Sequence, residues 1–185
     1  MLLPYDIDAY FYVDNGMSNI FCIDCGNRLD RDVRPKFLKL GNKFDIGSTY
    51  DGELILSERS KLVFSSIFTS LNFETYPTDK GVYSRRCDLG FVRIDADFRP
   101  IEFSGKCDLC GGYKEIGPVG PAKLICDEDL GDFDILQSDL EVGFGNRKHR
   151  LIMIGMAAFS RMRQKKLSGL FSGPVYSSSL SRWWK

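Results

Sequence analysis

The chain has 185 residues, enough for one domain with a substantial core, and 43% of them are hydrophobic, which is typical of a globular protein and excludes general disorder. Its 25 acidic and 25 basic residues cancel, so the overall charge gives no reason to expect nucleic-acid binding, although it leaves local patches open. No apolar run reaches the roughly 18 residues of a membrane span, and the N-terminus lacks the features of a signal peptide, so we expect a cytoplasmic protein.

The first half of the chain predicts two strands and one helix. Aromatic and β-branched residues at 9–13 predict a strand, and the run at 36–40 predicts a second one. Ser57 is a typical N-cap residue, and the apolar spacing that follows predicts a buried helix over 58–70. The positions expected to face the core are Leu62, Val63, Phe64, Ile67, Phe68 and Leu71.

Short strands are predicted in the middle of the chain. Residues 77–81 contain Pro and Gly and predict a turn. The runs at 90–94 and 101–103 predict two strands paired with each other across a short turn, and a further strand is predicted at 123–126. The strand at 101–103 leads directly into a cysteine motif.

The last part of the chain predicts a strand, a helix and another strand. The run at 151–154 predicts a buried strand, residues 156–167 an amphipathic helix with Gly169 as a left-handed cap, and residues 175–176 a short strand. The helical positions expected to face inward are Met156, Phe159, Met162 and Leu167. We therefore predict a single domain over 1–176, followed by a Ser-rich tail at 177–185 whose Trp183 and Trp184 suggest that its end docks.

Two runs share the pattern CxxCG, namely CIDCG at 22–26 and CDLCG at 107–111. Each has the spacing of a zinc knuckle, a tight turn that points two thiolates at one metal, and two knuckles supply the four ligands of a closed tetrahedral site. The predicted ligands of a structural Zn²⁺ ion are Cys22, Cys25, Cys107 and Cys110. Together with the elements above, this gives an α+β fold with a mainly antiparallel sheet, about two helices and a four-cysteine site.

Other chemistry for the cysteines has less support. A redox CxxC pair needs its first cysteine at a helix N-terminus, and the glycine that follows each pair argues against a helix there. A catalytic zinc ion needs an open coordination position, which four thiolates close. Cys87 and Cys126 are interpreted as small buried hydrophobic residues, and His149 as a surface loop residue. Because no phosphate loop, nucleophile elbow or HExxH motif is present, we expect no enzymatic activity.

Charge is distributed unevenly in the second half of the chain. Residues 127–141 contain seven acids and no base, whereas residues 142–166 contain seven Arg or Lys and no acid. An acidic surface could bind a basic protein such as a nuclease, although such a run is more often a solvated face. The basic segment could contact phosphate, or simply pair with the neighbouring acids. The candidate partner-binding residues are Asp127, Glu128, Asp129, Asp132 and Asp134.

The two knuckles and the later part of the chain resemble a known family. After the second knuckle come DFDILQ at 132–137, the apolar strand, the amphipathic helix and LSGLFSGPV at 167–175. This combination is similar to the double-CxxCG motif family of bacterial immunity proteins from polymorphic toxin systems. The resemblance implies a cytosolic protein that binds and blocks a cognate toxin, with the cysteines as a metal site, but it carries over no toxin-contacting residue. The alternatives are a zinc-ribbon protein that binds nucleic acid or has a regulatory role, and a thiol–disulfide enzyme.

Overall fold

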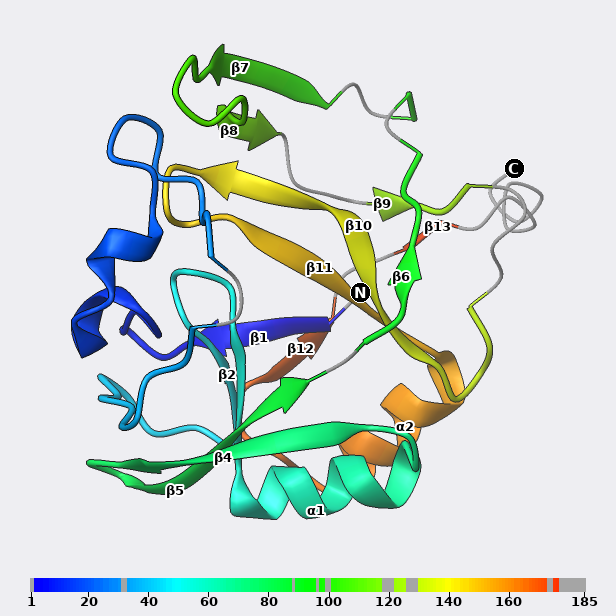
Figure 1. The fold of residues 1–185 in the computed structure, drawn as a ribbon. Helices are drawn as coiled ribbons and strands as arrows, with labels where there is room; N and C mark the ends of the chain where they lie inside the picture. Colours follow the sequence, from blue (N-terminus) through cyan, green and yellow to red (C-terminus); the bar gives the residue numbers. More distant parts are fainter. Residues whose placement is uncertain are drawn as a thin grey trace.

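The computed structural model describes residues 2–30, 33–87, 89–95, 97–98, 101–117, 122–125, 130–172 and 175–176. Within them lie two α-helices and a curved sheet (Figure 1). The helices are α1 (Glu58–Ile67) and α2 (Met156–Gln164), and two 3-10 helices, η1 (Val13–Asn15) and η2 (Ser18–Ile20), precede the first knuckle. The strands are β1 (Leu2–Asp6), β2 (Ile46–Ser48), β3 (Leu54–Ser57), β4 (Asn72–Thr78), β5 (Gly81–Cys87), β6 (Phe91–Val92), β7 (Glu102–Lys106), β8 (Tyr113–Gly117), β9 (Ala122–Lys123), β10 (Ile135–Phe144), β11 (His149–Ile154), β12 (Leu170–Ser172) and β13 (Val175–Tyr176).

Eleven of these strands form one sheet in the order β4-β5-β3-β2-β1-β11-β10-β8-β7, with β12 added on β1 and β6 on β10. Most neighbours are antiparallel, whereas β1 and β2 are parallel, as are β6 and β10. A separate parallel pair joins β9 and β13. The predicted fold class, α+β with a mainly antiparallel sheet, is therefore confirmed.

The central strands are apolar on both faces, because both faces of the sheet are covered. In β3, Leu54 and Leu56 pack with Phe64 of α1, whereas Ile55 belongs to a second core on the opposite face. The residues of β11 alternate in the same way between the helix-covered core and a third cluster. This explains why both segments are continuous apolar runs in the sequence, as expected for strands buried on two sides.

Helix α1 begins where the sequence predicts it. The hydroxyl of Ser57 accepts a hydrogen bond from the N–H of Ser60 (3.2 Å), as an N-cap residue does. The helix ends at Ile67, earlier than predicted. Phe64 is buried as expected, but Leu62 is 68% exposed, so its assignment to the core was wrong. Leu62 lies two positions from the buried Ser60 and two from the buried Phe64, and an offset of two positions turns a side chain to the opposite face of a helix.

Helix α2 is also confirmed, with a shorter span than predicted. Met162 and Leu167 are buried, whereas Met156 is 72% exposed, which corrects its predicted inward position. The helix buries the face that carries Ala158 and Met162, four residues apart, and Met156 lies on the other side. Gly169 has the expected left-handed conformation (φ 83°), but the helix has already ended at Gln164, so Gly169 shapes the turn before β12 and is not the cap.

Both strands predicted before the helix were wrong. Residues 9–12 have no strand partner among the described residues, and η1 begins at Val13. The N–H groups of Phe11 and Tyr12 donate to the two carboxylate oxygens of Asp51 (2.8 and 2.9 Å), so a side chain replaces the strand ladder there. In the run at 36–40, a single bridge from Leu38 to Thr78 is the only strand pairing described.

The strands predicted at 90–94 and 101–103 exist in part, but they do not pair with each other. β6 pairs with β10, and β7 pairs with β8. β10 begins within the acidic run and was not predicted, although it buries Ile135 and Val142. β11, β13 and the turn between β4 and β5 agree with the prediction, and β9 covers the start of the strand predicted at 123–126. Cys126 and the tail at 177–185 lie outside the described residues, so the predicted division into domain and tail stays a prediction.

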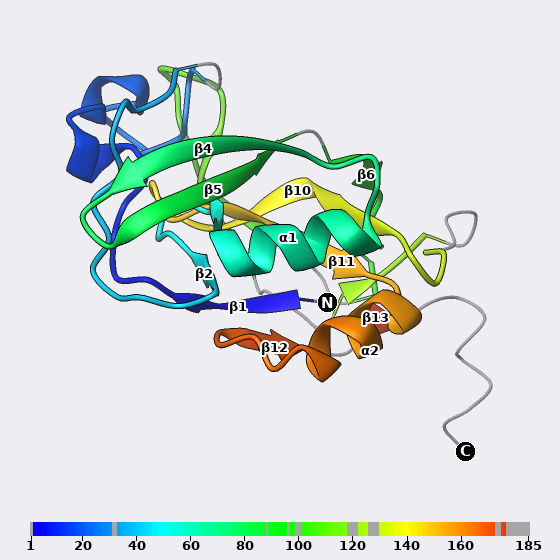
Figure 2. The same ribbon diagram turned by 90° about the horizontal axis from the view of Figure 1, so that it is seen from below.

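The two helices lie at one end of the molecule, and the β7–β8 hairpin lies at the other (Figure 1). Figure 2 shows α1 and α2 from below. All residues of β7 are exposed. β8 joins the sheet through two register pairs with the end of β10, at Gly143 and Phe144. The hairpin therefore projects from the sheet, and it carries the second cysteine motif in its turn.

Candidate metal centre

The first CxxCG run forms a tight turn directly after η2. The N–H of Cys22 donates to the carbonyl of Asn27 (2.8 Å), and the N–H of Gly26 donates to the carbonyl of Cys22 (2.8 Å). Gly26 has a φ of 72°, a left-handed conformation that favours glycine. The turn is closed by a bridge between Phe21 and Arg28.

The second CxxCG run repeats this geometry between β7 and β8. The N–H of Cys107 donates to the carbonyl of Gly112 (2.7 Å), and the N–H of Gly111 donates to the carbonyl of Cys107 (2.9 Å). Gly111 has a φ of 74°. The two runs are therefore copies of one knuckle. Neither has its first cysteine at the N-terminus of a helix, which is the position that a thioredoxin-like redox centre uses.

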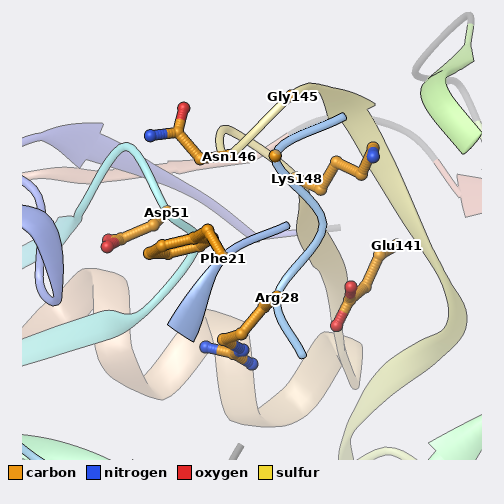
Figure 3. Close-up of a pocket in the computed structure, with 8 residues that line it drawn as sticks. Phe21, Arg28, Asp51, Glu141, Gly145, Asn146 and Lys148 are labelled. Carbon is orange, nitrogen blue, oxygen red and sulfur yellow. The ribbon is translucent and has the colours of Figure 1, made fainter. Parts of the chain in front are cut away.

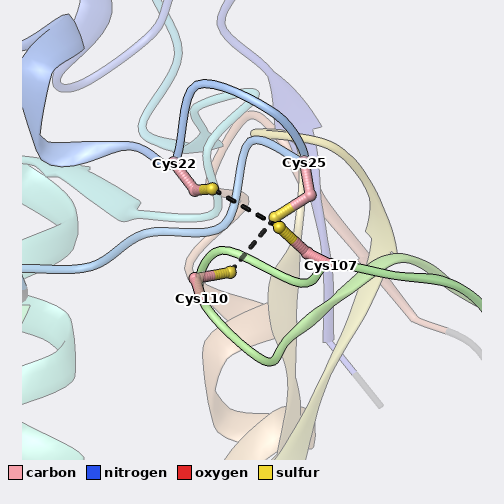
Figure 4. A group of neighbouring side chains, drawn as sticks. All are labelled: Cys22, Cys25, Cys107 and Cys110. Carbon is pink, nitrogen blue, oxygen red and sulfur yellow. Dashed lines mark hydrogen bonds between the residues drawn. The ribbon is translucent and has the colours of Figure 1, made fainter.

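The four cysteine sulfurs meet at one point (Figure 4). All four Sγ atoms lie within 4.8 Å of one another. The Sγ atoms of Cys22 and Cys107 are 3.7 Å apart, and those of Cys25 and Cys110 are 3.3 Å apart. Tetrahedral coordination with metal–sulfur bonds of about 2.3 Å would separate the sulfurs by about 3.8 Å. Three of the cysteines are buried and Cys110 is partly buried, so the cluster could hold a metal ion shielded from solvent.

The residues that follow the knuckles join them to a third segment. The side-chain N–H of Asn27 donates to Sγ of Cys110 in the other knuckle (3.5 Å). The ammonium of Lys148, from the turn between β10 and β11, donates to the side-chain oxygen of Asn27 and to the carbonyl of Tyr113. Gly26 packs against the same turn, because an added Cβ would lie 2.7 Å from the nitrogen of Asn146. The β10–β11 turn is thus a third wall of the site.

The surroundings shift the pKa values of Cys25 and Cys110 in opposite directions. Burial raises the pKa of the Cys25 thiol to about 12. In contrast, the hydrogen bond from Asn27 lowers the pKa of Cys110 to about 6. Burial lowers the pKa of Lys148, while the nearby Cys25 and Glu141 act in the opposite direction. Because metal ligation requires thiolates, binding must displace protons from the site.

A small cavity of about 10 Å³ adjoins the first knuckle (Figure 3). Four charged side chains line it, namely Arg28, Asp51, Glu141 and Lys148. Burial raises the pKa of Asp51, although hydrogen bonds from two main-chain N–H groups favour its charged form. The volume is about that of one water molecule, which is too small for an organic ligand. Because Gly26 and Lys148 also line it, the cavity lies beside the cysteine cluster.

Arg28 connects the first knuckle to the sheet through Glu53 of the β2–β3 turn. One carboxylate oxygen of Glu53 accepts from Arg28 (2.6 Å) and from the hydroxyl of Tyr12 (2.8 Å), and the other accepts from Arg85 of β5 (2.6 Å). Burial by itself would raise the pKa of Glu53, but the two guanidinium groups outweigh it and lower this pKa to about 2. The knuckle is thus anchored by a buried, fully paired carboxylate.

The candidate acidic surface is only partly described. Asp132 and Asp134 are exposed and lie in the loop that precedes β10. This loop is tied to the start of α2, since the carbonyl of Asp132 accepts from Ala158 (3.0 Å) and that of Asp134 accepts from Gly155 (2.9 Å). The remaining candidates, Asp127, Glu128 and Asp129, lie outside the described residues.

Within the described part of the chain, four of the seven basic side chains in 142–166 have side-chain or ring partners. Lys148 is buried, Arg147 lies against the rings of Tyr10 and Tyr50, Arg150 pairs with Glu141 (3.5 Å), and Arg161 lies over the ring of Phe133. These contacts favour pairing inside the chain over a dedicated phosphate-binding patch.

His149 is a half-buried residue of β11 paired with Val142, which corrects its assignment to a surface loop. Burial lowers its pKa. Cys87 is the last residue of β5. Asn27 and Lys148 were not predicted to belong to the site. Asn27 follows the knuckle directly and could have been suspected, but Lys148 sits in a basic run and gives no local signal of burial.

Comparison of the chain with protein-family models, with curated proteins and with solved structures finds no match. No helix in the described ranges is long and apolar enough to cross a membrane.

Proposed function

We propose that this chain is an immunity protein that binds and neutralises a cognate bacterial toxin, and that its cysteine centre holds a structural zinc ion. The observation that carries the proposal is the closure of two matched CxxCG knuckles on one buried centre. They come from segments 85 residues apart, and their hydrogen bonding is the same. This pairing is also the main feature of the family that the sequence resembles.

The donor set favours zinc with a structural role. Four thiolates around a tetrahedral point suit zinc or iron, and zinc is the common occupant of closed four-cysteine sites. Such a shell has no open position for a substrate, and the centre clamps the projecting β7–β8 hairpin to the first knuckle. The metal would thus hold the hairpin and the first knuckle together.

Binding of a protein partner fits the charge distribution. Asp132 and Asp134 present carboxylates on a loop that backbone hydrogen bonds hold to α2. Rigid acidic residues of this kind attract basic proteins such as nucleases by charge complementarity. The contacts described above occupy much of the neighbouring basic segment, which supports a protein partner over nucleic acid.

The metal can be tested on protein purified without added zinc. We expect about one zinc per chain and none in Cys110→Ser, which removes one ligand. Elemental analysis measures both, and the visible absorption of an iron–thiolate centre would identify iron. A folded wild-type protein without bound metal would contradict the proposed centre.

The partner can be tested with the product of the adjacent reading frame. We expect this product to arrest growth, and co-expression of the present chain to restore growth through a 1:1 complex. Asp132→Asn with Asp134→Asn should slow association by about 10-fold at low salt. The matched control is Glu102→Gln with Glu115→Gln, exposed acids on the β7–β8 hairpin. Failure of both rescue and complex formation would reject the immunity function, and salt-sensitive binding to DNA instead would favour the zinc-ribbon alternative.

A further inference from the structure

Lys148 is a buried lysine next to the cysteine cluster. The residue as a whole is only 9% exposed, although lysine is rarely buried without a charged partner. The acceptors of its ammonium, Asn27 Oδ1 and the carbonyl of Tyr113, are both uncharged. The fold therefore places a positive charge in the interior without pairing it directly to a carboxylate at those contacts.

The position of this charge is defined by the two knuckles. Asn27 directly follows the first knuckle, and Tyr113 comes two residues after Gly111 of the second. The amide of Asn27 accepts from Lys148 with its oxygen and donates to Sγ of Cys110 with its nitrogen (3.5 Å). Lys148 comes from the β10–β11 turn, distant in sequence from both knuckles, so a single ammonium bridges all three segments.

Electrostatics supplies a reason for this arrangement. Four thiolates and one divalent cation leave roughly two units of net negative charge on the centre. Such a charge is costly to bury unless an opposite charge lies nearby. Lys148 reaches the cluster through Asn27, whose side-chain oxygen accepts from the ammonium and whose nitrogen lies 3.5 Å from Sγ of Cys110, and the carboxylate of Glu141 lines the same small cavity as Lys148.

We propose that Lys148 is the internal counter-cation of the four-cysteine centre, and that its charge sets how tightly the centre retains a divalent metal. The inference rests on the proposed metal site and deepens it. Lys148 acts as a positioning residue, because it reaches the thiolates through Asn27 and through space and supplies no ligand. Burying the ammonium costs free energy, and its attraction to the negatively charged metal–thiolate centre offsets this cost once metal is bound.

The experiment compares zinc affinity, by competition with a chromophoric chelator, with the stability of the metal-free protein. Lys148→Met removes the charge and the hydrogen bonds, Lys148→Gln keeps a donor without the charge, and Lys148→Arg keeps the charge. We expect the Met and Gln variants to bind zinc about 10- to 100-fold more weakly. Arg should remain close to wild type. Lys106→Met, which removes an exposed lysine next to Cys107, is the matched control and should leave the affinity unchanged.

The stability measurement separates charge compensation from a packing role. Without metal, the Met variant should be as stable as wild type or more stable, because a buried ammonium with neutral thiols is a cost. Equal zinc affinities of wild type and the Met and Gln variants would overturn the inference. The inference would also be overturned if the Met variant lost the same amount of stability with and without metal. The same holds if the Gln variant alone bound zinc as tightly as wild type. If wild type itself binds no zinc, both the proposed metal centre and this inference are rejected.

Discussion

At the scale of single residues, Glu53 shows how one carboxylate connects the cysteine cluster to the sheet. It accepts hydrogen bonds from Arg28, next to the first knuckle, and from Arg85 in β5. These contacts are nearly excluded from solvent, since the side chains of Arg28, Arg85 and Glu53 are 16%, 12% and 10% exposed. Removing the carboxylate would leave two buried guanidinium groups without their shared partner.

We therefore expect Glu53→Gln to lower the free energy of unfolding at pH 7 by about 3–5 kcal/mol. Folding lowers the pKa of Glu53 from 4.5 to about 2. Its contribution is thus complete above the unfolded value and is lost as the pH falls through the folded value. In urea unfolding, the difference between wild type and variant should shrink from pH 7 to about pH 3.

Glu102→Gln provides the control for this pH dependence, because Glu102 is exposed on β7. Its effect on stability should stay within about 0.5 kcal/mol. If Glu53→Gln lowers the free energy of unfolding equally at both pH values, packing, and not the buried charge, holds the network together.

At the scale of secondary-structure elements, α1 begins at the N-cap residue that the sequence predicts. Ser57 accepts from Ser60 N–H (3.2 Å), and its hydroxyl donates to Asp45 (2.9 Å). Asp45 also accepts from the N–H of Ser168 (2.9 Å), so the cap of α1 is tied to the segment after α2. The sequence showed the cap, but the link to Ser168 depends on the tertiary structure.

Ser57→Ala should lower the free energy of unfolding by about 1 kcal/mol, because it removes the acceptor for the first turn of α1. Ser65→Ala makes the same change at an exposed position inside the helix. It should leave stability unchanged or raise it by about 0.5 kcal/mol, since Ala is the better helix former. Thermal unfolding of both variants measures the contrast, and equal effects would mean that Ser57 does not act as a cap.

At the scale of the whole molecule, the cysteine centre joins parts of the chain that share few other contacts. The β7–β8 hairpin pairs with the end of β10 and carries the second knuckle. Because β7 is exposed along its length, burial contributes little to holding it in place. The stability of this end of the molecule should therefore depend on the metal.

Removing the metal with a chelator should lower the melting temperature. Free zinc about 1,000-fold above its dissociation constant adds about 4 kcal/mol to the stability of the folded state. For a chain of this size, the expected shift is about 8–16 °C. Hydrogen exchange should localise the effect, with faster exchange over residues 22–29 and 102–117 after chelation.

The β4–β5 hairpin is an internal control for the exchange experiment. It is held by a long antiparallel register and by its packing next to α1 and β3, far from the β7–β8 hairpin in Figure 1. Its exchange should not change when the metal is removed. Faster exchange throughout the chain would indicate global unfolding and would rule out a local clamp.

The sequence alone determined those features that depend on neighbours a few residues apart. The CxxCG spacing identified the cysteines that meet at one point, Ser57 marked the start of α1, and the apolar run at 151–154 identified a buried strand. Each of these depends on local hydrogen bonding or on the periodicity of a single element. The same rule failed at 9–13, where the carboxylate of Asp51, 40 residues from Phe11, replaced the expected strand partner.

Only the tertiary structure decided which distant segments meet. It paired β6 with β10 and β7 with β8, placed Glu53 between Arg28 and Arg85, and brought Lys148 between the two knuckles. The physical reason is that burial and charge pairing depend on the surroundings in space. A lysine in a basic run has the same local sequence signal whether it is solvated or buried beside four thiols, and only the packing of three separate segments made Lys148 part of the site.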